Sequence, residues 1–156
     1  MADIRERLAA LGYAMPEPSA AVANYVPWVV TGGQVVVSGQ LPFRDGTLAA
    51  KGAVPSAVTV EAAKDAAAWC AVNALAQVEQ ALDGDWDRLE RVVRIGVFVC
   101  SDAGFAGQAG IANGASDLLV EALGERGRHA RAAVGVIALP LGAAVEVELM
   151  VAVRGG

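Results

Sequence analysis

Apolar residues recur every three or four positions in two long stretches of the chain, which is the spacing of one face of an α-helix. The first stretch begins at Thr59, a residue type suited to an N-cap, and is followed by Gly84. Its apolar face comprises Ala68, Ala71, Val72, Leu75, Val78 and Leu82. The second runs from about Phe105 to Leu123, ahead of Gly124, with Ile111, Ala115, Leu118, Leu119 and Ala122 on one stripe. Two long amphipathic helices are therefore predicted.

Alternation with a period of two predicts strands elsewhere. Two β-branched runs, 26–30 and 34–38, are joined through Gly32 and Gly33, which can adopt the positive φ angles of a tight hairpin turn. In the stretch 91–100 a core face is predicted for Val93, Ile95, Val97 and Val99. Residues 131–148 form two strand-like halves joined at Pro140 and Gly142, and the second continues to Arg154 with Glu146 and Glu148 on the face opposite the apolar residues.

The other segments are predicted to connect these elements. Asp3 can cap a short helix over residues 3–11, which is followed by a proline-containing connector over 13–23, and residues 43–55 are predicted to form a polar loop. The order of elements predicts a single α/β (α+β) domain over residues 1–156, a mixed sheet with the two long helices packed on one face. Because the other face would also carry valine and isoleucine, we expect self-association as a closed symmetric oligomer.

Composition and charge narrow the expected partners. The 156 residues carry a net charge of -5, with an isoelectric point near 4.8, and the twelve lysines and arginines are scattered. A nucleic-acid partner is not expected, because such a partner requires a basic stripe. The uncharged stretch 18–43 is interrupted by prolines and glycines, so no membrane partner or span is predicted. The first residues have no apolar run behind their charges, so a cytoplasmic location is expected.

Charges among small apolar neighbours make residues 131–148 the candidate site. Arg131 has Ala133 and Gly135 as same-side neighbours, which leaves room beside the guanidinium for a small ligand. A guanidinium binds a carboxylate through two parallel hydrogen bonds, so a small carboxylate would fit. The structural alternative is an ion pair of Arg131 with Glu146 or Glu148. The two glutamates are either a solvated pair or include one that positions or deprotonates a water molecule.

Other residue types offer less chemistry. His129 is the only histidine and lies in a charged segment, where solvent exposure is predicted. Cys70 and Cys100 are predicted to be buried apolar residues, and neither Tyr25 nor Ser38 has a base beside it in the sequence. No spacing of histidines, cysteines and carboxylates suggests a metal site, and no glycine-rich phosphate loop is present. We therefore expect neither a metal nor a nucleotide cofactor.

Several of these residues combine into a recognisable pattern. It comprises Tyr25, the run V-V-V-S-G-Q-L-P from Val35 to Pro42, Asn113, Arg131, the pair Leu139-Pro140, and V-E-V-E from Val145 to Glu148. With these residues the chain resembles the reactive intermediate deaminase family, also called RidA or YjgF-like, over nearly its whole length after residue 20.

This resemblance implies a chorismate-mutase-like fold and a homotrimer with sites in the clefts between subunits. It also implies hydrolytic deamination of enamines and imines, such as 2-iminopropanoate or 2-iminobutanoate, to 2-keto acids and ammonia without a cofactor. Arg131 would then bind the substrate carboxylate, and Glu146 would hold or activate the attacking water. The cleft would be lined by Tyr25 of a neighbouring subunit and by Ser38, Gly39, Asn113 and Ala133.

The chain departs from this family at Ala133, because many active members have a cysteine two residues after the arginine. The backbone amide and carbonyl near residue 133 survive that change, so loss of the thiol need not abolish attack by water. One alternative is a non-catalytic trimer that binds a small carboxylate or another metabolite. Another is ribonuclease activity, with which some members are labelled, although the acidic charge and the single histidine weigh against it.

Overall fold

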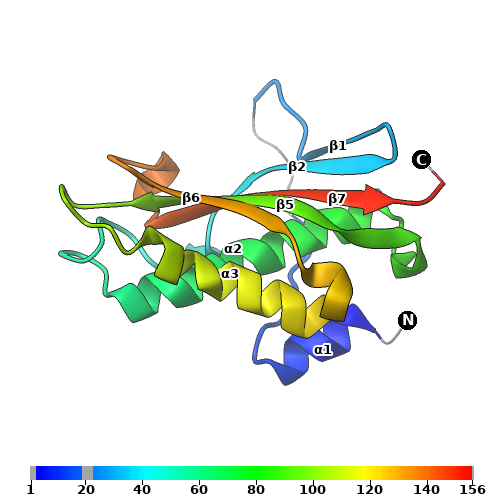
Figure 1. Cartoon of the computed structure of the whole chain (residues 1–156), viewed down its shortest axis with the longest axis horizontal. Coiled ribbons are helices and arrows are strands. Elements are labelled where there is room, and N and C mark those ends of the chain that lie inside the picture. Colours follow the sequence, from blue (N-terminus) through cyan, green and yellow to red (C-terminus); the bar gives the residue numbers. More distant parts are fainter. Residues whose placement is uncertain (1–2, 19–22, 156) are drawn as a thin grey trace.

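The computed structural model describes residues 3–18 and 23–155, and a five-stranded mixed sheet lies at its centre (Figure 1). The strands lie in the order β1-β2-β7-β5-β6, with bounds β1 Trp28–Thr31, β2 Gln34–Gln40, β5 Leu89–Cys100, β6 Ala130–Val136 and β7 Val145–Val153. Neighbouring strands are antiparallel except β5 and β6, which are parallel. This is the predicted mixed sheet, and β1 and β6 form its edges.

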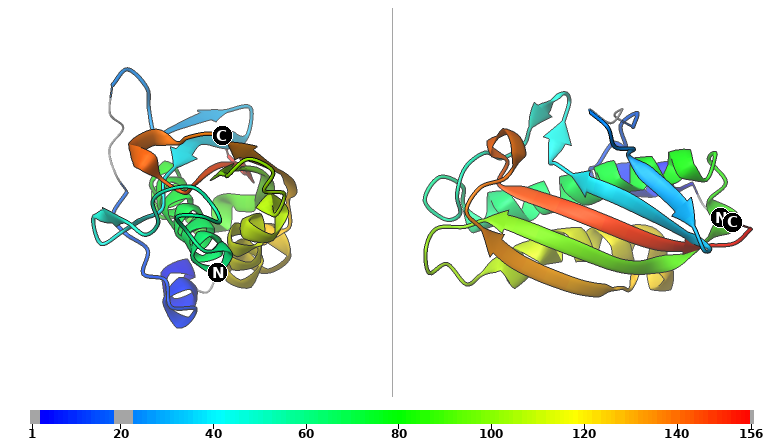
Figure 2. Two further views of the ribbon diagram at one scale, coloured as in Figure 1. Left: turned by 90° about the vertical axis from the view of Figure 1, so that its left-hand side faces the viewer. Right: turned by 90° about the horizontal axis from the view of Figure 1, so that it is seen from above.

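Two long helices, α2 (Val60–Ala81) and α3 (Gln108–Leu123), pack side by side on one face of the sheet, as predicted (Figure 2). The side chain of Thr59 caps α2 by accepting a hydrogen bond from the Ala62 amide. Helix α3 begins three residues later than predicted, because residues 102–105 form a turn with Gly104 at φ 81°. Short 3-10 turns span Trp86–Arg88, Gly124–Gly127 and Pro140–Gly142.

The predicted N-terminal helix is confirmed as α1 (Ile4–Ala10), which packs against the helical layer on the side away from the sheet (Figure 2). Asp3 caps it by accepting a hydrogen bond from the Arg5 amide. The Arg5 guanidinium pairs with Glu79 of α2, and Arg7 donates to the Ala122 carbonyl of α3. The connector predicted for 13–23 contains neither helix nor strand over 13–18, and its residues 19–22 lie outside the described residues.

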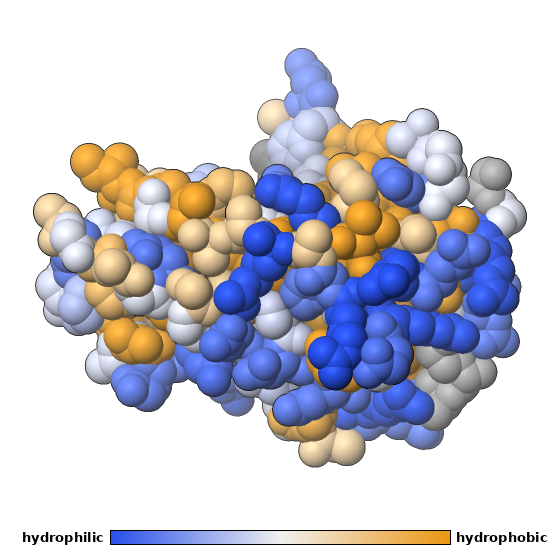
Figure 3. Space-filling model, in the orientation of Figure 1, coloured by the Kyte–Doolittle hydropathy of each residue, from blue (hydrophilic) through white to orange (hydrophobic). Residues whose placement is uncertain are grey.

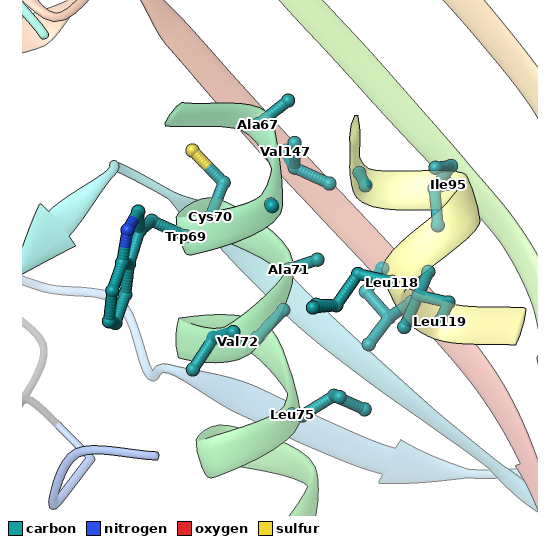
Figure 4. Close-up of a cluster of buried hydrophobic side chains, with 14 of the residues drawn as sticks. Ala67, Trp69, Cys70, Ala71, Val72, Leu75, Ile95, Leu118, Leu119 and Val147 are labelled. Carbon is teal, nitrogen blue, oxygen red and sulfur yellow. The ribbon is translucent and has the colours of Figure 1, made fainter. Parts of the chain in front are cut away.

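Small side chains dominate the core between the sheet and the helices. In Figure 4, Ala71 and Leu75 of α2 face Leu118 and Leu119 of α3, with Ile95 of β5 behind them; all five are buried. The two helices come close enough that a Cβ atom on Gly114 would overlap the carbonyl oxygen of Lys64. The glycine therefore sets how closely α3 approaches α2.

Strand β5 contains an irregularity that period-two alternation does not reveal. Its register against β7 shifts between Val92 and Arg94. An extra residue in one strand reverses the alternation of faces beyond it. Val92 is consequently buried and Val93 only half-buried, so the prediction that Val93 shares the core face with Ile95 is wrong.

The hairpin predicted between the first two strands is confirmed, with Gly32 at φ 54° and Gly33 at φ 72°. Strand β2 extends to Gln40, two residues further than predicted. The segment predicted as a loop over 43–55 contains a second small sheet, formed by β3 (Phe43–Arg44) and β4 (Thr47–Leu48). The turn between them uses Asp45 and Gly46 at positive φ, which permits a hairpin of this length.

Candidate functional site

Arg131 lies on the edge strand β6, and its side chain is held by helix α3. Nη1 donates hydrogen bonds to Oδ1 of Asn113, at 2.8 Å, and to Oγ of Ser116, at 3.1 Å. The two acceptors lie on one face of the helix, because they are three residues apart. Among the described residues, Nε and Nη2 have no acceptor, so the guanidinium edge that carries these two parallel donors is open to a ligand.

Arg131 and Glu146 point to opposite faces of the sheet. Arg131 pairs with Ile95, and Ile95 pairs with Leu149, both of which are buried against the helices. Glu146 pairs with Phe98, three residues further along β5, so its side chain points away from the helices. Within one chain the sheet therefore separates the arginine from the glutamate.

The ion pair considered for Arg131 is absent from the described part of the chain. Glu148 pairs instead with Arg94 of β5, with 3.0 Å between Oε1 and Nη1. Its carboxylate lies over Gly96, where a Cβ atom would come within 2.6 Å of Oε1. The ion-pair alternative is therefore wrong within one chain, because the register of β7 places both glutamates on the face that Arg131 does not share.

Glu146 is half-buried on the open face of the sheet and lies against Gly39. A Cβ atom at position 39 would overlap Oε1 of the glutamate, so only glycine allows this contact. Burial raises the pKa of the Glu146 carboxyl, and the nearby charge of Glu148 raises it further. A carboxyl group with a raised pKa binds and releases protons closer to neutral pH than an ordinary glutamate does, which suits proton transfer.

The remaining predicted residues divide between these two places. Ser38 donates from Oγ to the carbonyl of Val26, at 2.8 Å, which ties the end of β2 to the residue after Tyr25. Tyr25 is 55% exposed. We call Ser38, Gly39 and Glu146 the glutamate group. On the opposite side Ala133 pairs with the buried Val97, which places it on the same face as Arg131. We call Arg131, Asn113 and Ala133 the arginine group.

Two further residues lie beside the arginine group and were not among the predicted site residues. Ser116 follows Asn113 by three residues, a helical spacing that indicates a shared face. His129, predicted to be exposed, is half-buried, with Nε2 2.9 Å from Oγ of Ser116 and Nδ1 2.5 Å from the Gly127 carbonyl. That prediction is wrong because the 3-10 turn Gly124–Gly127 folds the segment against α3. His129 and Arg131 are two residues apart, and in an extended chain this spacing directs both side chains to the same face.

The other candidate groups are structural. Cys70 and Cys100 are buried, as predicted, and burial raises the pKa of the Cys70 thiol, which disfavours the nucleophilic thiolate. Within residues 3–18 and 23–155, no three histidines, cysteines or carboxylates are grouped so that they could hold a metal ion. None of the described helices is long and apolar enough to cross a membrane.

Comparisons with known proteins agree on one family. A family model described as "YjgF/chorismate mutase-like, putative endoribonuclease" matches residues 5–153. Protein TCP17 of Trypanosoma cruzi is 46% identical over 149 residues, which cover 95% of this chain and 92% of TCP17. The crystal structure of Atu1372 from Agrobacterium tumefaciens is 46% identical with a TM-score of 0.92, covering 97% and 92% of the two chains. E. coli TdcF, solved with bound serine, is 25% identical with a TM-score of 0.64, covering 89% and 94%.

Proposed function

This chain belongs to the YjgF/chorismate mutase-like family, and from that premise we propose that it hydrolyses small enamines or imines bearing a carboxylate, with release of a 2-keto acid and ammonia. The observation that carries the proposal is the open Nε and Nη2 edge of Arg131, held in place through Nη1. Two parallel donors match the two oxygens of a carboxylate. The small neighbour Ala133 leaves room beside them.

The carboxylate specificity has support from a relative. TdcF was crystallised with bound serine, an amino acid whose carboxylate and size resemble those of the proposed substrates. In this chain Nε and Nη2 of Arg131 would bind the carboxylate and thereby orient the adjacent imine carbon. Orientation of this kind lowers the barrier to attack by a water molecule.

Glu146 is the proposed proton-transfer group. Water adds to the carbon of the imine, which is protonated on nitrogen, while the Glu146 carboxylate accepts a proton from the water, which gives a neutral tetrahedral carbinolamine. Glu146 then returns that proton to the amino nitrogen, the carbon–nitrogen bond breaks, and the hydroxyl group loses its hydrogen to bulk water as the keto group forms, so that ammonia and the 2-keto acid leave. The raised pKa of Glu146 supports this role, because the group must be deprotonated in the first step and protonated for the second.

We propose further that the site forms between protomers of a homotrimer. Since the sheet separates Arg131 from Glu146, the arginine group of one protomer must meet the glutamate group of its neighbour. The open face of the sheet is apolar enough for such a contact, with Val29, Val36 and Val134 between 36% and 48% exposed. In Figure 3 apolar side chains gather along the upper edge, over β1, β2 and β6. A head-to-tail contact of this type closes into a ring when the rotation that relates neighbouring protomers closes, as a trimer requires.

Subunit complementation tests both proposals together. Arg131→Ala and Glu146→Gln variants should each lose most keto-acid release from a freshly generated imine, because Glu146 alone should contribute about 100-fold or more. After the two variants are unfolded and refolded together in equal amounts, about a quarter of the sites should combine an intact arginine with an intact glutamate. Recovery of about a quarter of the wild-type rate is expected. No recovery from a mixture that assembles like the wild type would contradict a site between subunits.

Gly39→Ala should impair the same step through Glu146. The added methyl group would displace the carboxylate and lower the turnover number, by up to about 100-fold for a displacement of the order of 1 Å. Steady-state rates of keto-acid release measure this effect. The control is the Gly39→Ala, Glu146→Gln double variant, which should be no slower than Glu146→Gln alone if Gly39 acts only through the glutamate.

The non-catalytic alternative is favoured by Ala133, which replaces the thiol that many active relatives carry. In that case the arginine group would bind a small carboxylate without turnover. Titration with 2-oxobutanoate and the imine assay separate the two functions. Binding that depends on Arg131, in protein that releases no keto acid from any imine offered, would replace hydrolysis with binding as the function.

A further inference from the structure

We propose that His129, acting through Ser116, is a positioning residue for Arg131, an inference that rests on the proposed function. His129, Ser116, Arg131 and Asn113 form a continuous series of hydrogen bonds along the α3 side of β6. The distances are 2.9 Å from His129 Nε2 to Ser116 Oγ, 3.1 Å from Oγ to Arg131 Nη1, and 2.8 Å from Nη1 to Asn113 Oδ1.

The chemistry of these groups determines the direction of each bond. The carbonyl of Gly127 can only accept, so Nδ1 of His129 must carry a hydrogen atom. In a neutral ring Nε2 is then the acceptor, and the Ser116 hydroxyl donates to it. The hydroxyl oxygen keeps its lone pairs for the Nη1 hydrogen of Arg131. A protonated ring would instead direct a second cation at the oxygen that already accepts from the guanidinium.

His129 is needed because the hydroxyl of a serine in a helix has a second possible hydrogen-bond acceptor in the helix backbone. The hydroxyl of such a serine can donate to the carbonyl of the residue four positions earlier, here Ala112. An acceptor at Nε2 keeps the hydroxyl turned toward β6, where its oxygen can hold Nη1. With Nη1 held by both Ser116 and Asn113, the guanidinium plane cannot rotate freely. The Nε and Nη2 edge therefore remains directed at the carboxylate before it binds, which reduces the entropy lost on binding.

Two replacements of His129 separate its two hydrogen bonds. Glutamine carries a side-chain oxygen at the reach of Nε2 and can accept from Ser116. Asparagine carries its amide group at the reach of Nδ1 and can donate to the Gly127 carbonyl, but it offers no acceptor to Ser116. His129→Gln should therefore lie closer to the wild type than His129→Asn does, whereas His129→Asn and Ser116→Ala should weaken binding of 2-oxobutanoate and raise KM by about three- to tenfold, with a smaller change in kcat.

The combined variant tests whether the two residues act in series. His129→Asn in the Ser116→Ala background should cause no additional loss, because both changes remove the same restraint on Arg131. Wild-type binding by Ser116→Ala, or a loss in His129→Gln that His129→Asn does not share, would overturn the proposal. The latter outcome would mean that His129 serves only to anchor the Gly127 turn.

Arg131→Ala, measured alongside, distinguishes failure of this inference from failure of the proposed function. If Arg131→Ala binds 2-oxobutanoate as the wild type does, the proposed function fails and this inference fails with it. If only Arg131→Ala loses binding, the positioning role alone fails.

Nitrogen-15 NMR of tag-free protein tests the positioning role without a ligand, because the signals of His129, the only histidine, can be assigned directly. The neutral-ring tautomer with its hydrogen on Nδ1, and an Nε2 signal that changes in Ser116→Ala, are expected; the tautomer with its hydrogen on Nε2 would overturn the proposal.

Discussion

Arg131→Ala is expected to lose about 2 to 5 kcal/mol of transition-state stabilisation, which is a fall in kcat/KM of about 30-fold to several thousand-fold. Nε and Nη2 of the guanidinium donate to no described residue, and the two hydrogen bonds that Nη1 makes to α3 lie at the surface, where their loss costs little stability. The substrate carboxylate would lose both of those donors at once. Keto-acid release from a freshly generated imine, measured over a range of imine concentrations, gives the value directly.

Arg131→Lys is the matched control for charge. Lysine keeps the positive charge but cannot present two parallel donors, so this variant should be intermediate between wild type and Arg131→Ala. The melting temperatures of all three proteins should agree closely, because Arg131 is exposed and makes its hydrogen bonds at the surface. Equal kcat/KM values for wild type and Arg131→Ala would exclude Arg131 from substrate binding.

Gly114→Ala is expected to lower the free energy of unfolding by about 3 kcal/mol. The added methyl group would overlap the backbone carbonyl of Lys64, and a carbonyl inside α2 cannot move aside as a flexible side chain can. Helix α3 would have to shift away from α2, which loosens the packing of Leu118 and Leu119 in the core. Denaturant unfolding at a fixed protein concentration measures the loss without a contribution from changes in assembly.

Gly110→Ala provides the same substitution on the same helix without the clash. Nothing lies within 4 Å of a Cβ atom at this position, and its φ angle is in the ordinary range. Alanine should therefore stabilise the protein by about 0.5 to 1 kcal/mol, because it favours the helix over the unfolded chain. If both variants shifted the unfolding midpoint in the same direction by a similar amount, close contact between α2 and α3 could not be the cause.

Much of the candidate site was predictable from residue types. The expectation that Arg131 binds a carboxylate follows from guanidinium chemistry. The resemblance placed Asn113 in the same cleft, and the structure joins the two side chains by a hydrogen bond to Oδ1. Ser116 could also have been predicted from the sequence, because its spacing of three residues from Asn113 places both on one face of the helix. His129 was not, because its burial depends on how the 3-10 turn folds the chain back onto α3.

Local periodicity in the sequence determined the elements themselves. The two long helices, the hairpin and the alternation of β7 follow from neighbours a few residues apart, which is the range over which backbone geometry and apolar spacing act. Only the tertiary structure decided which side of the sheet each charged residue occupies. That choice depends on the register of β6 and β7 against β5, which pairs Arg131 with Ile95 and Glu146 with Phe98. A shift of one residue in the pairing of β6 or β7 with β5 would move the charged side chain of that strand to the other face. The separation of Arg131 from Glu146 is therefore a property of strand pairing, because hydrogen bonds between distant segments determine it.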